Sequence, residues 1–486
     1  MRYSDTSAAN RSGQVALFPE LFRPSHTASH TDESRQLDSL SDKQHRVIHY
    51  LGSKLRLLDA ISDALSTVTP LGGSVCDLFA GSGAVSVNLK NAWRMIAVDI
   101  QEYSRVLCNG LLNPPSDGRS IAQALIGDAY RSDLRCRLRA SFEPLLSLEL
   151  EAVSKAAMGD PIPLCDLLEV GSLVAFEHEN SQKPPDIARA MRQALAGLKY
   201  HSLGAGPETV ISRYFGGLYF SWEQAIDFDS LLNQVHGLNE SDRDFYLAAV
   251  LATASDVVNT VGKHFAQPIK LRDSDGNPKR HLVKQTVKDR TLNVFRVFEE
   301  WVSRFDSIPR SEFKHLAIRS DYLEFLCRTD VEFDAVYADP PYTRDHYSRY
   351  YHVLETMSRY DVPEISRTLI HSDGRPKLSR GLYRVDRHQS PFCIKSRAPG
   401  AVEELCRAVS DRGIPLVLSY SPYNSASRSR PRLLSIDEIS AIASKYFNNI
   451  ECIPVDGVAH NKLNTISRNV ETDNVAEVIF ICTHRT

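Results

Sequence analysis

The sequence lacks any paired arrangement of cysteines. Its nine cysteines are scattered from Cys76 to Cys482, and the spacing Cys-x-x-Cys does not occur. A zinc ribbon and a disulfide framework are therefore not indicated, because both need cysteines at close and regular spacings. Unpaired cysteines fit a reducing compartment, so we expect a cytoplasmic protein.

Long apolar runs and an excess of charge of one sign are also missing. No uninterrupted apolar run approaches the roughly 20 residues of a membrane span, and the first residues lack the apolar core of a signal peptide. The formal net charge of -3 argues against a uniformly basic nucleic-acid coat protein. What is present, 42% hydrophobic and 24% charged residues in a chain of 486, predicts a soluble globular protein of two or three folding units.

The first part of the chain reads as a polar tail followed by a βαβ opening. Residues 1–44 are rich in Ser, Thr, Asp and His without sustained periodicity, and we expect them to form a flexible tail. A helix is predicted from Lys54 to about Val68. Strand-like runs at 75–79 and 95–98 flank a Gly-rich turn and a further apolar segment.

The middle of the chain interrupts this unit. Apolar residues recur at helical spacing from Trp222 to Gly262, where the glycine would end a helix, and again from Lys284 to Phe305. Strand signals resume only at 333–337, 416–418 and 477–482. The pattern therefore predicts an α/β unit split by a large, mainly helical insertion.

The segment Asp77-Leu-Phe-Ala-Gly81-Ser-Gly83 lies where a strand should turn into a helix. Glycine lets the backbone approach a ligand closely, so a cofactor loop is one interpretation. A plain strand-to-helix turn is the other, since the match to Gly-x-Gly-x-x-Gly is incomplete. Asp99, 22 positions after Asp77 at the end of the next strand, favours the cofactor, because a carboxylate there can accept both ribose hydroxyls of an adenosine.

The segment Asp339-Pro340-Pro341-Tyr342 follows another strand-like run. Two prolines hold the chain extended and remove two backbone donors. An aromatic amine is a poor nucleophile, and the Asp339 carboxylate and the Pro340 carbonyl are suited to accept its two N–H groups while Tyr342 stacks on the base. A proline-stiffened turn would look the same in isolation, but the glycine loop and Asp99 favour the catalytic interpretation.

With these segments in order, the sequence resembles the amino-methylating DNA methyltransferases, in particular the Dam-type, alpha-class adenine methylases. The resemblance covers about residues 46–113 and 310–486. Tyr50-Leu-Gly52-Ser-Lys54 is similar to the N-terminal cofactor segment of that family, and Asp339 to Tyr342 to its catalytic tetrad. Asp321 resembles an acid near the cofactor adenine, although Ser320 stands where glycine is commoner.

The resemblance implies a Rossmann-like S-adenosylmethionine methyltransferase fold with a mixed, mostly parallel sheet. It implies a catalytic domain of residues 45–115 and 310–486 and an inserted target-recognition domain of residues 116–309. The implied reaction is site-specific methylation of adenine N6 in double-stranded DNA, on a base flipped out of the helix. The implied cofactor-binding residues are Tyr50, Gly52, Lys54, Asp77, Phe79, Ala80, Gly81, Gly83, Asp99, Asp321 and Asp339.

Candidate DNA contacts come from two basic stretches. Between Lys263 and Arg290 there are eight Lys or Arg against three Asp, which favours a phosphate-tracking surface if they share one face. A solvated loop beside a helix is equally compatible with that composition. Basic and aromatic residues also follow the tetrad directly. The candidates are Lys279, Arg280, Lys284, Arg344, Tyr347 and Arg349.

Several alternatives stay open at this point. Cytosine-N4 methylation would use the same geometry, and Asp339 in place of the serine common in that group speaks against it. An RNA or protein amide methyltransferase and a catalytically decayed DNA-binding module are the others. Cytosine-C5 methylation needs a nucleophilic thiolate, and no Pro-Cys dipeptide occurs. We expect neither a bound metal nor a membrane association. A restriction or phage-defence protein is a possible partner, and the oligomeric state is left open.

Overall fold

The computed structural model describes residues 47–50, 52, 54–178, 184–344, 347–369, 376–421, 433–456 and 475–484. The predicted tail of residues 1–44 lies outside this description. The resemblance also places a closing hairpin in the stretch from His460 to Ile479, and its residues up to 474 lie outside as well. The account below concerns the described residues alone.

One sheet organises the part of the chain that holds the glycine loop and the Asp339 to Tyr342 segment. Its strands are β1 (Ser74–Leu78), β2 (Arg94–Asp99), β3 (Leu316–Arg319), β4 (Ala335–Ala338), β7 (Leu416–Tyr420), β8 (Asn449–Asp456) and β9 (Val475–Thr483). They lie in the order β3-β2-β1-β4-β7-β9-β8. The five strands from β3 to β7 are parallel, whereas β9 pairs antiparallel with both β7 and β8. The predicted mixed, mostly parallel sheet is therefore confirmed.

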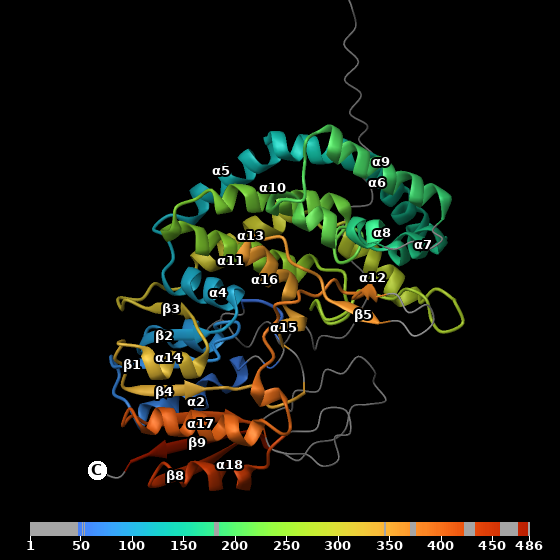
Figure 1. Cartoon of the computed structure of the whole chain (residues 1–486). Helices are drawn as coiled ribbons and strands as arrows, with labels where there is room; N and C mark the ends of the chain where they lie inside the picture. The colour runs from blue at the N-terminus through green and yellow to red at the C-terminus, as the bar shows by residue number, and fades with distance from the viewer. Residues whose placement is uncertain are drawn as a thin grey trace, which may run out of the picture. The chain divides into compact units, whose positions relative to one another are not determined.

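Both faces of the sheet are covered, as parallel strands require. Cys76, Leu78 and Val336 point into a core shared with α14 (Tyr322–Arg328), α17 (Ala398–Ser410) and α18 (Ile436–Ala443). Val75 and Met95 point to the opposite core with α2 (Leu58–Ser66) and α3 (Ala84–Leu89). Figure 1 shows α14, α17 and α18 on one side of the sheet. Because helices cover both faces of the sheet, the residues of β1 after Ser74 are all buried.

Between β2 and β3 the described chain is built of helices. After α4 (Glu102–Leu112), these are α5 (Gly118–Arg131), α6 (Asp133–Ala157), α7 (Ile162–Val170), α8 (Leu173–His178), α9 (Pro185–Tyr200), α10 (Trp222–His236), α11 (Glu240–Val257), α12 (Arg280–Arg290) and α13 (Val294–Asp306). They stack as layers above the sheet in Figure 1. The large helical insertion is thus as predicted, while the boundaries 116–309 of a separate domain remain a prediction.

The helical layers join the sheet through α4 and α11. Arg105 of α4 holds Asp244 of α11 through both guanidinium nitrogens, at 2.7 and 3.0 Å. A Cβ on Gly110 would lie 2.5 Å from the Asp244 carbonyl oxygen, so only glycine lets the two helices approach this closely. The helices of the insertion therefore pack directly on the part of the chain that carries the sheet.

The predicted helix end at Gly262 is wrong. α11 ends at Val257, and the backbone turns away because the Asn259 N–H donates to the Tyr219 carbonyl instead of continuing the helix. The Asn259 side chain is buried and contacts Thr286 and Arg290. A tertiary hydrogen bond therefore sets the end of this helix, not the glycine.

The chain after the tetrad crosses back to the helical layers. α15 (Tyr347–Tyr350) and α16 (His352–Arg359) lead to a small antiparallel pair, β5 (Arg367–Leu369) and β6 (Pro376–Leu378). The Phe265 N–H donates to the Tyr350 carbonyl, and Arg380 donates to the Ile269 carbonyl. The segment after the tetrad and the loop after α11 therefore lie side by side.

Candidate functional site

The carboxyl ends of β1, β2 and β4 meet at one edge of the sheet and line a single pocket. Its walls bring together segments more than 280 residues apart in the sequence, from Tyr50 to Asp339. The predicted site residues that line it are Tyr50, Gly52, Lys54, Asp77, Phe79, Ala80, Gly81, Asp99, Asp321, Asp339, Pro340, Pro341 and Tyr342. Of the predicted cofactor residues, Gly83 is not part of this lining.

The loop after β1 is made of residues in left-handed backbone conformations. Phe79, Gly81 and Gly83 have φ of 64°, 56° and 75°. Such a conformation is costly for phenylalanine, and it is found where surrounding structure fixes the backbone. Gly83 is the N-cap residue of α3, where a Cβ would meet Cys108 Sγ at 3.1 Å. Gly83 therefore serves the turn, while Gly81 faces the pocket.

Asp99 closes this loop from β2. Its Oδ2 accepts the Gly81 N–H and its Oδ1 accepts the Gln101 N–H, both at 2.9 Å. Burial raises the pKa of Asp99, and the two backbone hydrogen bonds oppose that rise. A carboxylate offers about four lone-pair sites, so each oxygen can still accept a hydroxyl from a ligand in the pocket.

Asp77 lies in β1 beneath the loop and is 2% exposed. Ser86 Oγ donates to its Oδ2 at 2.6 Å. Burial raises the pKa of Asp77 to about 7, and the hydrogen bond from Ser86 opposes the rise. The group therefore changes charge near neutral pH, which suits a carboxyl that meets a cationic ligand.

The tetrad follows β4 and is paired with the N-terminal segment. Lys54 Nζ lies 2.9 Å from Asp339 Oδ1. It also lies 3.4 Å from Oε1 of Glu477, a fully buried side chain on β9. Lys54 Nζ is 5.2 Å from the centroid of the Tyr342 ring. One ammonium thus joins the first cofactor segment, the tetrad and the last strand.

Aromatic side chains form two parts of the pocket wall. Phe79 lies 5.1 Å from Tyr322 and 5.3 Å from Phe392, centroid to centroid. On the other side, Tyr50 stacks on Tyr351 at 4.9 Å. Flat apolar walls on both sides of a carboxylate-lined pocket fit a ligand with an aromatic base and polar ends.

The comparisons with known proteins agree with this geometry. Residues 50–135 match the model of the D12 class N6 adenine-specific DNA methyltransferases, and this segment holds the first cofactor motif, the glycine loop and Asp99. Over this segment the chain is similar to the D12 class, and the resemblance stated from the sequence is thereby confirmed.

Two proteins similar to this chain are named as a methylase and a methyltransferase. The modification methylase LlaI of Lactococcus lactis subsp. lactis is 22% identical over 442 residues, which are 88% of this chain and 52% of LlaI. The type II methyltransferase M.NlaIII of Neisseria lactamica is 22% identical over 446 residues, covering 89% of this chain and 98% of M.NlaIII. The chain spans about half the length of LlaI and nearly all of M.NlaIII.

Some pocket residues were not found from the sequence. A short segment around the 3-10 helix η5 (Pro391–Cys393) contributes His388, Ser390, Pro391 and Cys393. Ser348 Oγ donates to the His388 carbonyl at 2.6 Å, which ties the segment to α15. Burial lowers the pKa of His388, although Asp321 and Asp99 oppose this. No spacing signal marks such a segment, because it reaches the pocket only through the fold.

The predicted DNA contacts separate into two groups. Tyr347 lines the pocket itself. Arg344 is exposed at a shallow hollow lined also by Lys395 and Ser396, next to the pocket. Arg349 donates to the Tyr383 hydroxyl at 3.0 Å, and its guanidinium lies over that ring. Of the two arginines, Arg344 is thus the exposed one.

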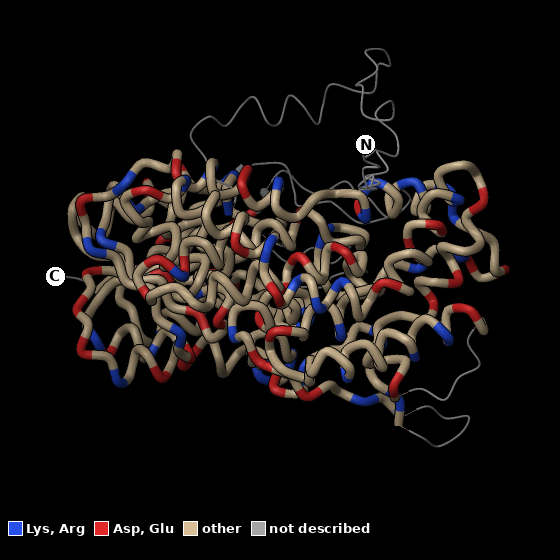
Figure 2. Tube along the Cα trace, turned by 90° about the horizontal axis from the view of Figure 1, so that it is seen from above, with Lys and Arg blue, Asp and Glu red and all other residues tan. Residues whose placement is uncertain are grey.

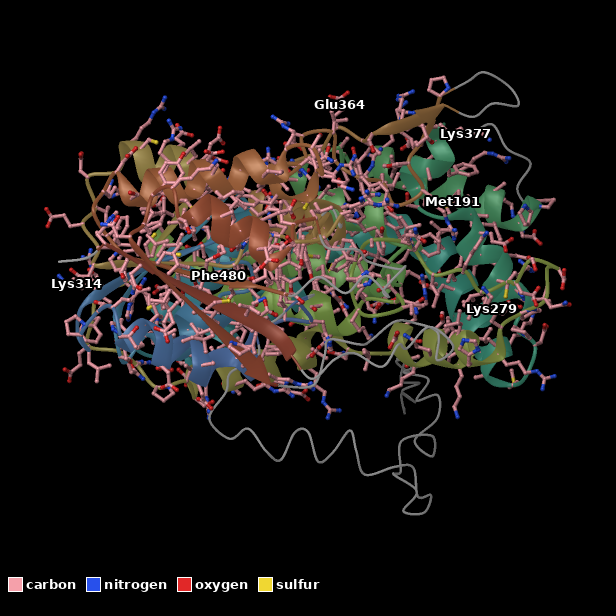
Figure 3. All side chains as sticks on the ribbon, turned by 90° about the horizontal axis from the view of Figure 1, so that it is seen from below. Met191, Lys279, Lys314, Glu364, Lys377 and Phe480 are labelled. Atoms are coloured by element: carbon pink, nitrogen blue, oxygen red, sulfur yellow. The ribbon has the colours of Figure 1, made fainter. Side chains whose placement is uncertain are left out.

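The second group lies on α12, away from the sheet. Arg280 and Lys284 are exposed one turn apart, and Lys279 is half-buried at the helix start. Figure 3 places Lys279 at the opposite end of the molecule from Lys314. Three other cations of the basic stretch are used internally: Lys263 pairs with Asp289, Arg272 with Asp166 and Arg290 with Glu149. The stretch is therefore not one uniformly basic face.

Charges elsewhere are mixed. Figure 2 shows Lys and Arg interspersed with Asp and Glu across the described chain. Within the described ranges, no group of three His, Cys, Asp or Glu side chains is placed to hold a metal ion. No helix among those residues is long and apolar enough to cross a membrane.

Proposed function

We propose that this protein transfers a methyl group from S-adenosylmethionine to the N6 amino group of an adenine flipped out of double-stranded DNA. The observation that carries the proposal is the pairing of Asp339 with Lys54 beside the Gly81–Asp99 loop, in a chain similar to the D12 class over residues 50–135. An amine acceptor and a nucleoside-sized pocket then share one edge of the sheet.

The residues present fit the cofactor. Asp99 would hold the two ribose hydroxyls, and the backbone at Phe79 and Gly81 would lie against the ligand. The rings of Phe79 and Tyr322, which line the pocket and pack against Phe392, would hold its adenine, with Asp321 in the same lining. Asp77 would face its cationic methionine part. S-adenosylmethionine supplies a methyl group activated on a sulfonium.

The chain's own groups would prepare the adenine amine. The Asp339 carboxylate and the Pro340 carbonyl would each accept one N6–H, which draws the nitrogen lone pair out of the ring and toward the methyl group. Asp339 is the group that would take up the proton released from N6. Tyr342, which packs against Tyr420 at 5.5 Å in a T-shaped arrangement and lines the pocket, would stack on the flipped base.

The test of this function is methyl transfer from the labelled cofactor to duplex DNA by the purified full chain. We expect N6-methyladenine as the product after digestion to nucleosides. N4-methylcytosine would assign the rival reaction of the same geometry, and transfer to RNA or protein alone would assign the others. A folded protein that binds the cofactor but methylates none of these substrates would indicate a catalytically decayed DNA-binding module.

We propose that the helical insertion of residues 116–309 is the target-recognition domain and that α12 contacts the DNA backbone. Replacing Lys279, Arg280 and Lys284 with Ala should weaken DNA binding and lower the slope of log affinity against log salt by about 2 to 3. A triple replacement of Lys314, Arg328 and Lys445, exposed cations of the catalytic domain, is the matched control. Equal slopes for the two variants would remove α12 from the interface.

Cofactor binding should depend on pH through Asp77. Its pKa of about 7 applies to the protein without a cationic ligand, and a cation favours the ionised carboxyl. Affinity should therefore rise as the pH increases toward about 7 and level off above it, with up to one proton released on binding below pH 7 and none well above it. Calorimetry in two buffers of different ionisation enthalpy measures that proton. Asp77→Asn should abolish the dependence; its persistence in that variant would assign the proton to another group.

The biological setting follows from the relatives as a proposal. LlaI is named a modification methylase and M.NlaIII a type II methyltransferase. We propose that this protein likewise modifies a specific DNA sequence in the cytoplasm, with a restriction or phage-defence nuclease as its partner. Mapping methylated adenines in an expressing host would identify that sequence.

A further inference from the structure

A glutamate of the antiparallel strand enters the site, and the chemistry described above does not use it. Glu477 lies near the start of β9 and is fully buried. Its neighbour Val478 pairs with Tyr420, the last residue of β7. Because β9 runs against the parallel strands, its first residues reach the edge at which β1 and β4 end. The reversed strand thereby brings a carboxylate from the end of the sequence to the tetrad.

Lys54 lies between this glutamate and the catalytic aspartate. Its Nζ is 2.9 Å from Asp339 Oδ1 and 3.4 Å from Glu477 Oε1. The Lys54 side chain is 4% exposed and that of Glu477 0%, so water screens these interactions weakly. Two carboxylates share one ammonium, and these three side chains together carry one net negative charge when all are ionised.

We propose that Glu477 is a positioning residue of the methyl-transfer reaction. Its carboxylate attracts the Lys54 ammonium, so that Lys54 neutralises the negative charge of Asp339 only in part. This inference rests on the proposed function. With Lys54 divided between two anions, Asp339 keeps enough negative charge to accept an N6–H and then the proton. With Glu477 uncharged, Lys54 would pair with Asp339 alone and weaken it as an acceptor.

The other titratable groups around the cluster do not compete for this role. Tyr337 and Tyr347 face the pair, and burial raises the pKa of each well above its usual value, so both stay neutral. Tyr342 faces Lys54. Asp77 also faces Asp339, but it would titrate with cofactor binding, and saturating cofactor removes it from the measured rate. We therefore expect the acid limb at saturation to report the Asp339 carboxyl.

The test is the pH dependence of the single-turnover methyl-transfer rate of the full chain, with cofactor and DNA saturating. In Glu477→Gln we expect the acid limb to move to lower pH by about one unit, because a neighbouring negative charge is lost. We expect the plateau rate to fall about tenfold, the size of a modest loss of acid–base catalysis. Glu477→Asp, which keeps the charge, should retain the wild-type acid limb with a lower plateau. Glu451→Gln, an exposed glutamate on β8, is the control and should match wild type.

A Glu477→Gln enzyme with the wild-type acid limb would overturn the inference, whatever its plateau rate. Carbon-13 NMR of the Asp339 carboxyl provides a readout that needs no activity: its pKa should fall in Glu477→Gln, and an unchanged value would also overturn the inference. Wild-type protein that transfers no methyl group would instead contradict the proposed function. If Glu477→Gln does not fold, Glu477→Asp decides, and a shifted acid limb there would refute the role of the charge.

Discussion

Replacing Asp339 with Asn should reduce the rate of methyl transfer to DNA by about 100-fold or more, the size seen when one group that stabilises a transition state is removed. Asparagine has the shape of aspartate but cannot take a proton from N6, and its own amide N–H groups would oppose those of the adenine. Lys54 would keep Glu477 as its partner at 3.4 Å. The expected defect is therefore in catalysis and not in assembly of the pocket.

The fold should tolerate this replacement. Burial raises the pKa of Asp339, and Lys54 opposes the rise. A raised pKa means that ionising this carboxyl costs more free energy in the folded protein than in the unfolded chain. Replacing it with the neutral asparagine should therefore not lower the melting temperature. Radiolabel transfer, thermal denaturation and calorimetric cofactor binding measure the three quantities separately. Asp330→Asn, at an exposed aspartate just before β4, is the control. Near wild-type transfer by the Asp339 variant would refute the tetrad assignment.

Replacing Gly81 with Ala should lower cofactor affinity by about 100-fold, which corresponds to about 3 kcal/mol. A Cβ at this position would lie 2.7 Å from the Tyr50 hydroxyl oxygen. Tyr50 is stacked on Tyr351 at 4.9 Å and has no room to retreat without breaking that contact. Displacing either the loop or the ring changes the wall where the cofactor would lie, so the loss should appear in binding.

Gly72 supplies a matched control for this prediction. It has φ of +85°, close to the left-handed region of Gly81, yet a Cβ there would meet no atom within 4 Å. Gly72→Ala should therefore show only the conformational cost of about 1 to 2 kcal/mol in folding free energy, with cofactor affinity unchanged. Calorimetric titration of both variants makes the comparison, and equal affinities would show that Gly81 is required for the turn alone.

The sequence predicted the local parts of this site well. The strand at Asp77, the loop to Gly83, Asp99 and the tetrad are each contiguous, and a turn that needs glycine or proline leaves a signal in a few residues. The helical nature of the insertion was also predicted, since apolar residues recur at helical spacing through α10 and α11. Composition and spacing are enough where the cause is local.

The basic stretch of residues 263–290 was predicted less well. Its net charge favoured a phosphate-tracking surface, but Lys263, Arg272 and Arg290 are paired with carboxylates from other elements. Asp166, the partner of Arg272, and Glu149, the partner of Arg290, each lie more than 100 residues away in the sequence. A count of charges cannot distinguish a paired guanidinium from one open to solvent.

The sequence by itself determined which residues form the glycine loop and the Asp339 to Tyr342 turn, because those features depend on neighbouring residues along the chain. Only the tertiary structure decided that Glu477 shares Lys54 with Asp339, that the His388–Cys393 segment lines the pocket and that α11 ends at Val257. Each of these follows from a strand direction or a contact between distant elements. Such contacts are set by how the sheet and the helices pack, and no local pattern of residues records them.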